Sequence, residues 1–257
     1  MRNQLNIFFT ALMFFTRIPV PKNIDHSSDM LQKSARYFSW VGFVVGVIAS
    51  GSLFLFHLLF SPALSVLFSM IISILITGAF HEDGFADVCD AFGGGWTKEK
   101  ILLIMKDSRL GTYGVAGLII ILAAKFLLLL ELLLNLNIIQ CCSIYIAANS
   151  ISRLMTVTIM QQYNYVADID TSKSKPLANR KLTVTEMSIA VTGGLLPFLL
   201  LKPLFLLAII PGIVARIFLG RYFNKWIGGY TGDCLGATQQ VCEIFFYIGC
   251  ILIWKYI

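Results

Sequence analysis

The stretch that decides the fold is Tyr37–His81, which reads YFSWVGFVVGVIASGSLFLFHLLFSPALSVLFSMIISILITGAFH. It contains no Asp, Glu, Lys or Arg. A helix that crosses a bilayer needs about 20 apolar residues, so this stretch is long enough for two membrane spans. Ser61 and Pro62 supply the break between them, because proline lacks the backbone N–H that a helix interior requires.

The composition extends this conclusion to the whole chain. Of the 257 residues, 57% are hydrophobic and 13% are charged, and the mean hydropathy is +0.79. Soluble domains carry about twice that share of charged residues, so a water-soluble globule is excluded. Further apolar segments lie at 114–134, 138–159, 184–201, 203–220 and 240–256. We expect an all-α polytopic integral membrane protein with about seven transmembrane helices, within a range of six to eight.

The positive charges predict the orientation. Cytoplasmic loops carry an excess of Lys and Arg, and with the N-terminus inside most of the 20 Lys and Arg residues fall on the cytoplasmic side. This predicts a single domain, 1–257, in the inner cell membrane, with cytoplasmic loops at 81–113, 160–183 and 221–239. Topology and anionic lipid account for the net charge of +6, so no nucleic-acid partner is expected.

The N-terminal segment 1–35 is predicted to lie at the membrane interface. It contains the apolar run Ile7–Phe15, preceded by Arg2. A cleaved signal peptide is the alternative, but a small-residue cleavage site does not follow the run. We therefore favour an interfacial helix or a partial insertion.

The acidic residues are few and gather directly after the charge-free stretch. Asp83, Asp87 and Asp90 are spaced i, i+4, i+7, which places them within an arc of about 60° if the segment is helical. Carboxylates on one stripe repel one another, and a divalent cation removes that repulsion. Because oxygen ligands suit Mg²⁺ or Mn²⁺, the spacing predicts a metal site. The alternative is a solvated acidic face at the membrane surface.

Two later blocks combine glycines with hydroxyl and charged side chains. They are Met105–Gly114 and Gly228–Ala237, and both fall on the predicted cytoplasmic side. Glycines let backbone N–H groups approach an oxyanion, and Lys or Arg neutralises phosphate charge. The alternatives are a basic interfacial turn and a hairpin between helices. The candidate residues in these blocks are Lys106, Arg109, Gly111, Gly114, Thr231, Gly232 and Asp233.

Two basic residues fall within predicted spans. Arg153 lies one turn from Asn149, so the two can share a helix face. Charged groups at that depth usually face the protein interior and carry function, which makes Arg153 a candidate binding residue. Lys125 is a weaker candidate for a functional residue, because the long side chain of a lysine can extend along the helix to the membrane interface (snorkelling).

Taken together, these blocks resemble the adenosylcobinamide-GDP ribazoletransferase family, also called cobalamin synthase. The similar runs are Gly78–Asp87 with Asp90, Lys106–Gly114 and Gly229–Ala237, and the resemblance covers essentially the whole chain. It implies a transferase of cobalamin biosynthesis that joins adenosylcobinamide-GDP to α-ribazole, or to its 5′-phosphate, and releases GMP. The partners it implies are these two small molecules and the lipid bilayer, while the oligomeric state, including a homo-oligomer, stays open.

The resemblance also implies roles for the candidate residues. In this phosphoryl transfer, Asp83, Asp87 and Asp90 would hold Mg²⁺ on the diphosphate. Asp233 would complete the metal shell or accept the proton of the ribazole 3′-hydroxyl, so that the catalytic set is Asp83, Asp87 and Asp233. The residues expected to contact substrate are Lys106, Arg109, Arg153, Gly111, Gly114, Thr231 and Gly232.

Two other functions remain as alternatives. A CDP-alcohol phosphotransferase also uses aspartates and Mg²⁺ at a membrane surface, but its Asp-Gly-x-x-Ala-Arg signature is matched only in part by Asp83-Gly84 and Ala86-Asp87. A small-solute transporter would place polar residues at the bilayer midplane and often shows inverted repeats. Here the acids gather at one membrane face and the sequence shows no repeat.

Overall fold

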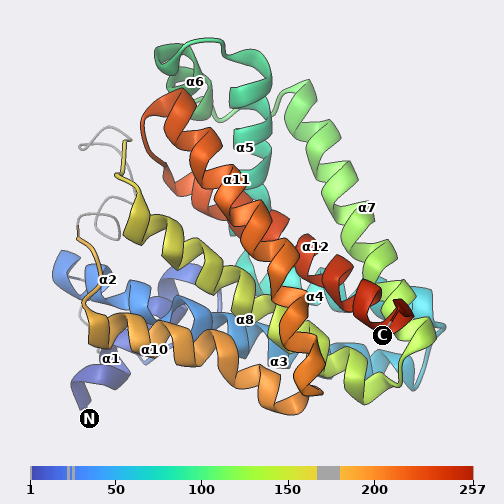
Figure 1. Ribbon diagram of the computed structural model, residues 1–257. Helices are drawn as coiled ribbons and strands as arrows, with labels where there is room; N and C mark the ends of the chain where they lie inside the picture. The colour runs from blue at the N-terminus through green and yellow to red at the C-terminus, as the bar shows by residue number, and fades with distance from the viewer. Residues whose placement is uncertain (1, 22–23, 25–26, 167–179, 257) are drawn as a thin grey trace.

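The computed structural model describes every residue except 1, 22–23, 25–26, 167–179 and 257 (Figure 1). The described part is helical, and its one recorded β contact is an isolated bridge between Tyr165 and Tyr230. The all-α prediction is therefore confirmed. The elements are α1 (Arg2–Phe15), α2 (Ser28–Ser34), η1 (Ala35–Tyr37), α3 (Phe38–His57), α4 (Pro62–Thr77), α5 (Phe80–Gly94), α6 (Lys98–Met105), α7 (Thr112–Asn135), α8 (Ile138–Gln162), α10 (Val184–Leu195), η2 (Leu196–Leu200), η3 (Pro203–Ala208), α11 (Ile209–Ile227) and α12 (Gly232–Tyr256).

The charge-free stretch forms α3 and α4, and Pro62 opens α4 as predicted. The axes of α4 and α5 then differ by 88°. The cause is a left-handed backbone at two successive residues, with φ of 68° at Gly78 and 58° at Ala79. Such values end a helix, and they are uncommon for a residue other than glycine. This bend places the acidic stripe on a separate helix, α5, and the predicted loop 81–113 is therefore largely helical.

The number of membrane spans in the described residues is five or six, and six is the lower end of the predicted range. Within the described residues, five helices are long and apolar enough to cross a membrane, or up to six if the bent pair α4 and α5 is one span. The prediction of about seven is not confirmed. The segment 184–201 is one reason, because α10 ends at Leu195 and gives way to the 3₁₀ turn η2, which contains Pro197. The other reason is α4, whose 16 residues are long enough for a span only together with α5.

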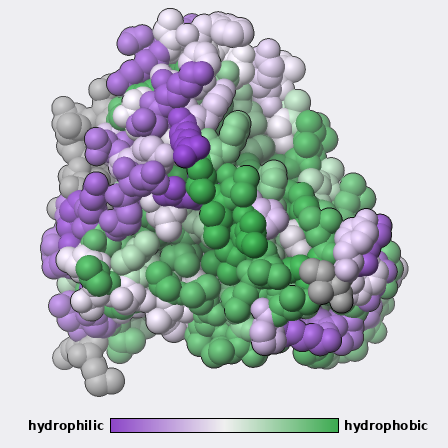
Figure 2. All heavy atoms as spheres, viewed as in Figure 1, coloured by the Kyte–Doolittle hydropathy of each residue, from purple (hydrophilic) through white to green (hydrophobic). Residues whose placement is uncertain are grey.

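Two inner helices are the most buried of the candidate spans. In the most apolar windows of α8 and α12, 72% of the residues are buried, whereas the share in α7 is 22%. Glycines allow close packing against α8, since a Cβ on Gly42 would lie 2.3 Å from the Asn149 carbonyl oxygen. Figure 2 shows a broad hydrophobic area across the middle of one face, with hydrophilic atoms gathered above it, to its left and at its lower right. This surface fits a bilayer environment.

Candidate active site

The site is organised by the contact between α5 and the start of α12. A Cβ on Gly84 would lie 3.0 Å from the Asp233 Cα atom, and a Cβ on Gly236 would lie 3.1 Å from the His81 carbonyl oxygen. Glycine at both positions therefore allows the two backbones to approach closely. This contact brings the first acidic block next to the third block, two blocks that the sequence places on the same side of the membrane.

Three of the predicted acids lie together at this contact. Asp83 is exposed, and Asp87 and Asp233 are half-buried. The Asp87 carboxylate is close enough to Asp83, Asp90 and Asp233 for electrostatic repulsion with each of them. Among the described residues, the carboxylates of Asp83 and Asp87 have no hydrogen-bond or ion-pair partner, and Asp233 bonds only its own backbone N–H. The site therefore carries negative charge that the protein does not neutralise.

Asp90 belongs to the same stripe but is used differently. Its two carboxylate oxygens accept hydrogen bonds from the backbone N–H groups of Gly111, at 2.7 Å, and Gly114, at 2.8 Å. Both donors lie at the N-terminus of α7, where the helix dipole favours a negative charge. A Cβ on Gly114 would lie 2.3 Å from Asp90 Oδ2, so glycine is needed there. The amides predicted to reach phosphate thus bond Asp90 and tie α5 to α7.

The second block also supplies an open groove beside Asp90. The groove is lined in part by Arg109, Gly111 and Tyr113. Arg109 Nη2 lies 2.6 Å from Asp107 Oδ2, and the Arg109 side chain is 87% exposed. Hydrogen bonds from Arg109 lower the pKa of Asp107 to about 2. Lys106, which follows α6, is also exposed and has a partner of its own.

Thr231 in the third block has a structural contact. Its buried hydroxyl accepts a hydrogen bond from the backbone N–H of Cys234 at 3.3 Å, which caps α12, and lies 3.0 Å from the Met105 sulfur. This joins the start of α12 to the end of α6. Gly232 instead faces an apolar groove between α12, α5 and the N-terminal helix α1.

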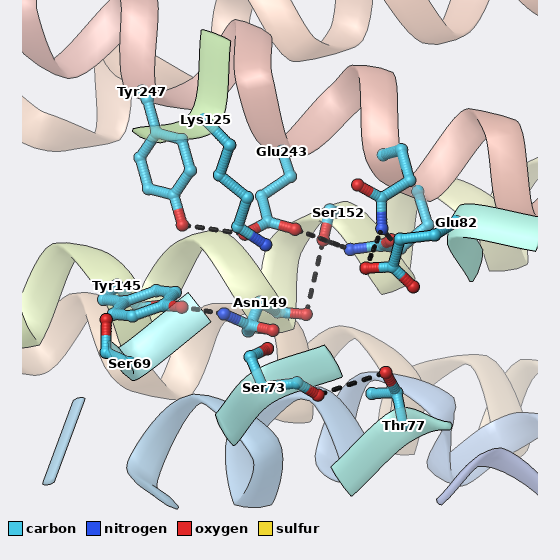
Figure 3. Close-up of polar contacts among 12 residues, drawn as sticks. Ser69, Ser73, Thr77, Glu82, Lys125, Tyr145, Asn149, Ser152, Glu243 and Tyr247 are labelled. Carbon is cyan, nitrogen blue, oxygen red and sulfur yellow. Dashed lines mark hydrogen bonds and ion pairs between the residues drawn. The ribbon is translucent and has the colours of Figure 1, made fainter. Parts of the chain in front are cut away.

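The bundle interior holds a second polar group, drawn in Figure 3. Lys125 of α7 and Glu243 of α12 form an ion pair at 2.7 Å, and both side chains are buried. Tyr247 donates a second hydrogen bond to Glu243 Oε1, at 2.8 Å. Lys125 therefore does not snorkel to the interface, the alternative that the sequence left open, because a carboxylate of another helix is available inside the bundle.

The interior contacts continue toward the acidic helix. Gln239 Nε2 donates to Glu243 Oε2 at 2.9 Å, and Gln240 Nε2 donates both to Gln239 Oε1 and to Glu82 Oε1 at 3.0 Å. Glu82 directly precedes Asp83, but it is buried whereas Asp83 is exposed. We did not predict this series of hydrogen bonds from the sequence. The spacing of Gln239, Glu243 and Tyr247 by four residues in one apolar span was nevertheless a signal for a polar helix face.

Arg153 lies inside the bundle with this interior group, as predicted for a charge at that depth. It is 2% exposed. Its Nη1 donates to the Asn149 carbonyl oxygen at 2.9 Å and to Asn149 Oδ1 at 3.0 Å. Its guanidinium also lies over the Phe38 ring. These partners hold Arg153 in the interior, whereas Arg109 is exposed.

The donor chemistry of the acids suits a hard cation. Within the described residues, no group of three His, Cys, Asp or Glu side chains is arranged to hold a metal ion. Mg²⁺, however, commonly binds one or two carboxylates together with water and substrate phosphates rather than a cage built by protein alone. Asp83 and Asp87, with free carboxylate oxygens, fit that kind of shared site.

The fold and this arrangement define a helical integral membrane protein with a carboxylate-rich site where α5, α7 and α12 meet. Comparison with known sequences identifies its family. The family described as cobalamin-5-phosphate synthase matches residues 7–251, and the chain belongs to this family. No solved structure matches the chain significantly.

Relatives of the same length carry a specific enzyme name. A protein of Shewanella frigidimarina is 44% identical over 247 residues, covering 95% of this chain and 94% of the relative. One of Shewanella halifaxensis is 45% identical over 248 residues, covering 96% and 95%, and one of Shewanella oneidensis is 43% identical over 245 residues, covering 95% and 93%. Each is named adenosylcobinamide-GDP ribazoletransferase.

Proposed function

We propose that this chain joins adenosylcobinamide-GDP to α-ribazole, or to α-ribazole 5′-phosphate, and releases GMP. The product is adenosylcobalamin or its 5′-phosphate. The observation that carries the proposal is the packing of the second and third sequence blocks against α5, which holds the first, in a chain that matches its ribazoletransferase relatives over nearly their full length.

The reaction is a phosphoryl transfer that needs alignment and charge neutralisation more than covalent chemistry. The ribazole 3′-oxygen bonds to the phosphorus nearest cobinamide, and the bond from that phosphorus to the bridging oxygen breaks. The electron pair of that bond leaves with GMP. The hydroxyl proton passes to a base, for which Asp233 is our candidate because its carboxylate lies against α5 and has no cationic partner in the described part.

Asp83 and Asp87 are our candidates to hold Mg²⁺ together with the diphosphate of adenosylcobinamide-GDP. When bound, the ion would neutralise charge that develops on the diphosphate. The exposed Arg109 can turn toward the same phosphates and orient them. Asp90 keeps the site in place by tying α5 to α7, so we assign it a positioning role beside any ligand role.

The site is proposed to face the cytoplasm in the inner membrane, in keeping with the positive charges of the adjoining segments.

The assay that tests the function uses purified protein in liposomes. Adenosylcobinamide-GDP and α-ribazole are added with and without Mg²⁺, and GMP is followed by chromatography. We expect GMP only when Mg²⁺ and ribazole are both present. Folded protein that releases no GMP would overturn the proposal, and CDP-diacylglycerol would then be tested as substrate.

A further inference from the structure

An apolar groove opens directly beside the proposed reaction centre. Its aromatic walls come from Phe15, Phe38 and Phe80, and its floor includes Gly232 and Gly236 of α12. Gly232 is the neighbour of Asp233, so a ligand in the groove lies next to the proposed base.

One polar side chain in this groove, His81, lacks a partner in the part of the chain that the structure describes. It is 2% exposed, and neither of its ring nitrogens makes a hydrogen bond to a described residue. Its ring centroid lies 5.6 Å from that of Phe38 and 5.5 Å from that of Phe80. A buried polar group without a hydrogen bond is costly, which is a reason to expect a partner that arrives with a ligand. A neutral imidazole offers such a ligand one N–H donor and one acceptor nitrogen.

This chemistry matches one part of the two substrates. The base of α-ribazole is a flat dimethylated benzimidazole with one ring nitrogen on the ribose and one free as an acceptor. Its remaining edge is apolar and suits aromatic walls. Guanine would bring several donors and acceptors that apolar walls leave unpaired, and the corrin ring is much larger than the base.

We propose that the groove binds the base of the acceptor, and that His81 donates a hydrogen bond to its free ring nitrogen. This inference rests on the proposed function and adds the residue that recognises the base through a hydrogen bond. The ribose attached to the base then extends past Gly232 toward Asp233, which places the attacking 3′-hydroxyl beside the acids.

The test compares two acceptors on the unmodified protein in liposomes. One is α-ribazole, and the other is the matching dimethylindole riboside, in which a C–H group replaces the free ring nitrogen. We expect KM for the indole acceptor to be about tenfold higher, the change that the loss of one hydrogen bond produces. The KM for adenosylcobinamide-GDP should be the same with either acceptor. Equal KM values for the two acceptors would overturn the proposal.

A variant then assigns the effect to His81. The substitution His81→Phe should raise KM for α-ribazole about tenfold and abolish the preference between the acceptors, since the donor is gone. His57→Phe is the matched control, because His57 is at the opposite end of α3 from the groove residue Phe38. This variant should keep the preference for α-ribazole over the indole acceptor. If His81→Phe retains the tenfold preference, the assignment is wrong. His81→Asn, which keeps an N–H donor, should retain part of the preference and serves if the Phe variant does not fold.

The two proposals fail in different ways. If the unmodified protein forms no GMP from α-ribazole, the proposed function is overturned. If it forms GMP at equal KM from both acceptors, the function stands and the role of His81 is overturned.

Discussion

The same two helices, α5 and α12, hold carboxylates in opposite states. Glu243 of α12 is buried, accepts hydrogen bonds from Gln239 and Tyr247, and pairs with Lys125. Asp83 and Asp87 face the site and have no such partner in the described part of the chain. A buried charge must be paired for the bundle to fold, whereas repelling acids at a surface add nothing to folding. The difference indicates that the interior acids serve the structure and the site acids serve a ligand.

The largest expected difference between substitutions of the site acids and of the interior acids is in the rate of turnover. Asp83→Asn should lower the rate of GMP formation by about 100-fold or more, because it removes charge that the reaction needs at the phosphates. The melting temperature in detergent should not change, since Asp83 is exposed and unpaired. Asp29→Asn on α2 is the control, and it should leave the rate unchanged. A rate for Asp83→Asn close to that of the control would contradict the division into two groups.

The next effect is on stability. Glu243→Gln should lower the free energy of unfolding by about 3–5 kcal/mol, because it leaves Lys125 buried without a counter-charge. The double substitution Lys125→Met with Glu243→Gln should recover much of that loss, as measured by thermal unfolding in detergent. If the single variant is as stable as the unmodified protein, the interior pair has no structural role.

Substitution of Asp90 is expected to have an effect on stability between those of Asp83→Asn and Glu243→Gln. Asp90→Asn should lower the free energy of unfolding by about 1–3 kcal/mol, because its amide nitrogen cannot accept the hydrogen bond from Gly111 or Gly114. Thermal unfolding of this variant beside Asp83→Asn checks the assignment. An unchanged melting temperature for Asp90→Asn would place it with the ligand-binding acids instead.

The smallest effect on folding is expected at Arg109. Arg109→Ala should leave the melting temperature unchanged from pH 5 to 8, because the ion pair that Arg109 makes with the described residue Asp107 is exposed and the pKa of Asp107 lies near 2. Any stabilisation from that pair is complete above the ordinary pKa of Asp107, 3.8, and is lost only as the pH falls toward 2. The same variant should raise KM for adenosylcobinamide-GDP severalfold. An unchanged KM would remove Arg109 from the phosphate contacts.

The sequence predicted the parts of this molecule that depend on local pattern. The break at Pro62 and the placement of Asp83, Asp87 and Asp90 on one helix follow from residue type and spacing. The close approach of α5 and α12 was only expected from a shared membrane side, and Gly84 and Gly236 make it possible.

Other features depend on partners far apart in the chain. The bend at Gly78 and Ala79 follows an apolar run that the sequence predicts as one continuous span. The residues around Asp90 do not indicate that its carboxylate accepts a hydrogen bond from Gly111. Lys125 and Glu243 meet only after α7 and α12 pack together. The count of seven spans is not confirmed, because apolar length alone does not distinguish a full helix from the 3₁₀ turn that contains Pro197.

Metal binding at the site acids tests the central claim most directly. Mn²⁺ can replace Mg²⁺ as a spectroscopic probe, so its binding is measured by electron paramagnetic resonance with adenosylcobinamide-GDP present and absent. We predict that Mn²⁺ binds in the presence of this substrate, and that its affinity falls at least about tenfold in Asp83→Asn but not in Asp29→Asn. Equal Mn²⁺ affinity in Asp83→Asn and the unmodified protein would contradict the account.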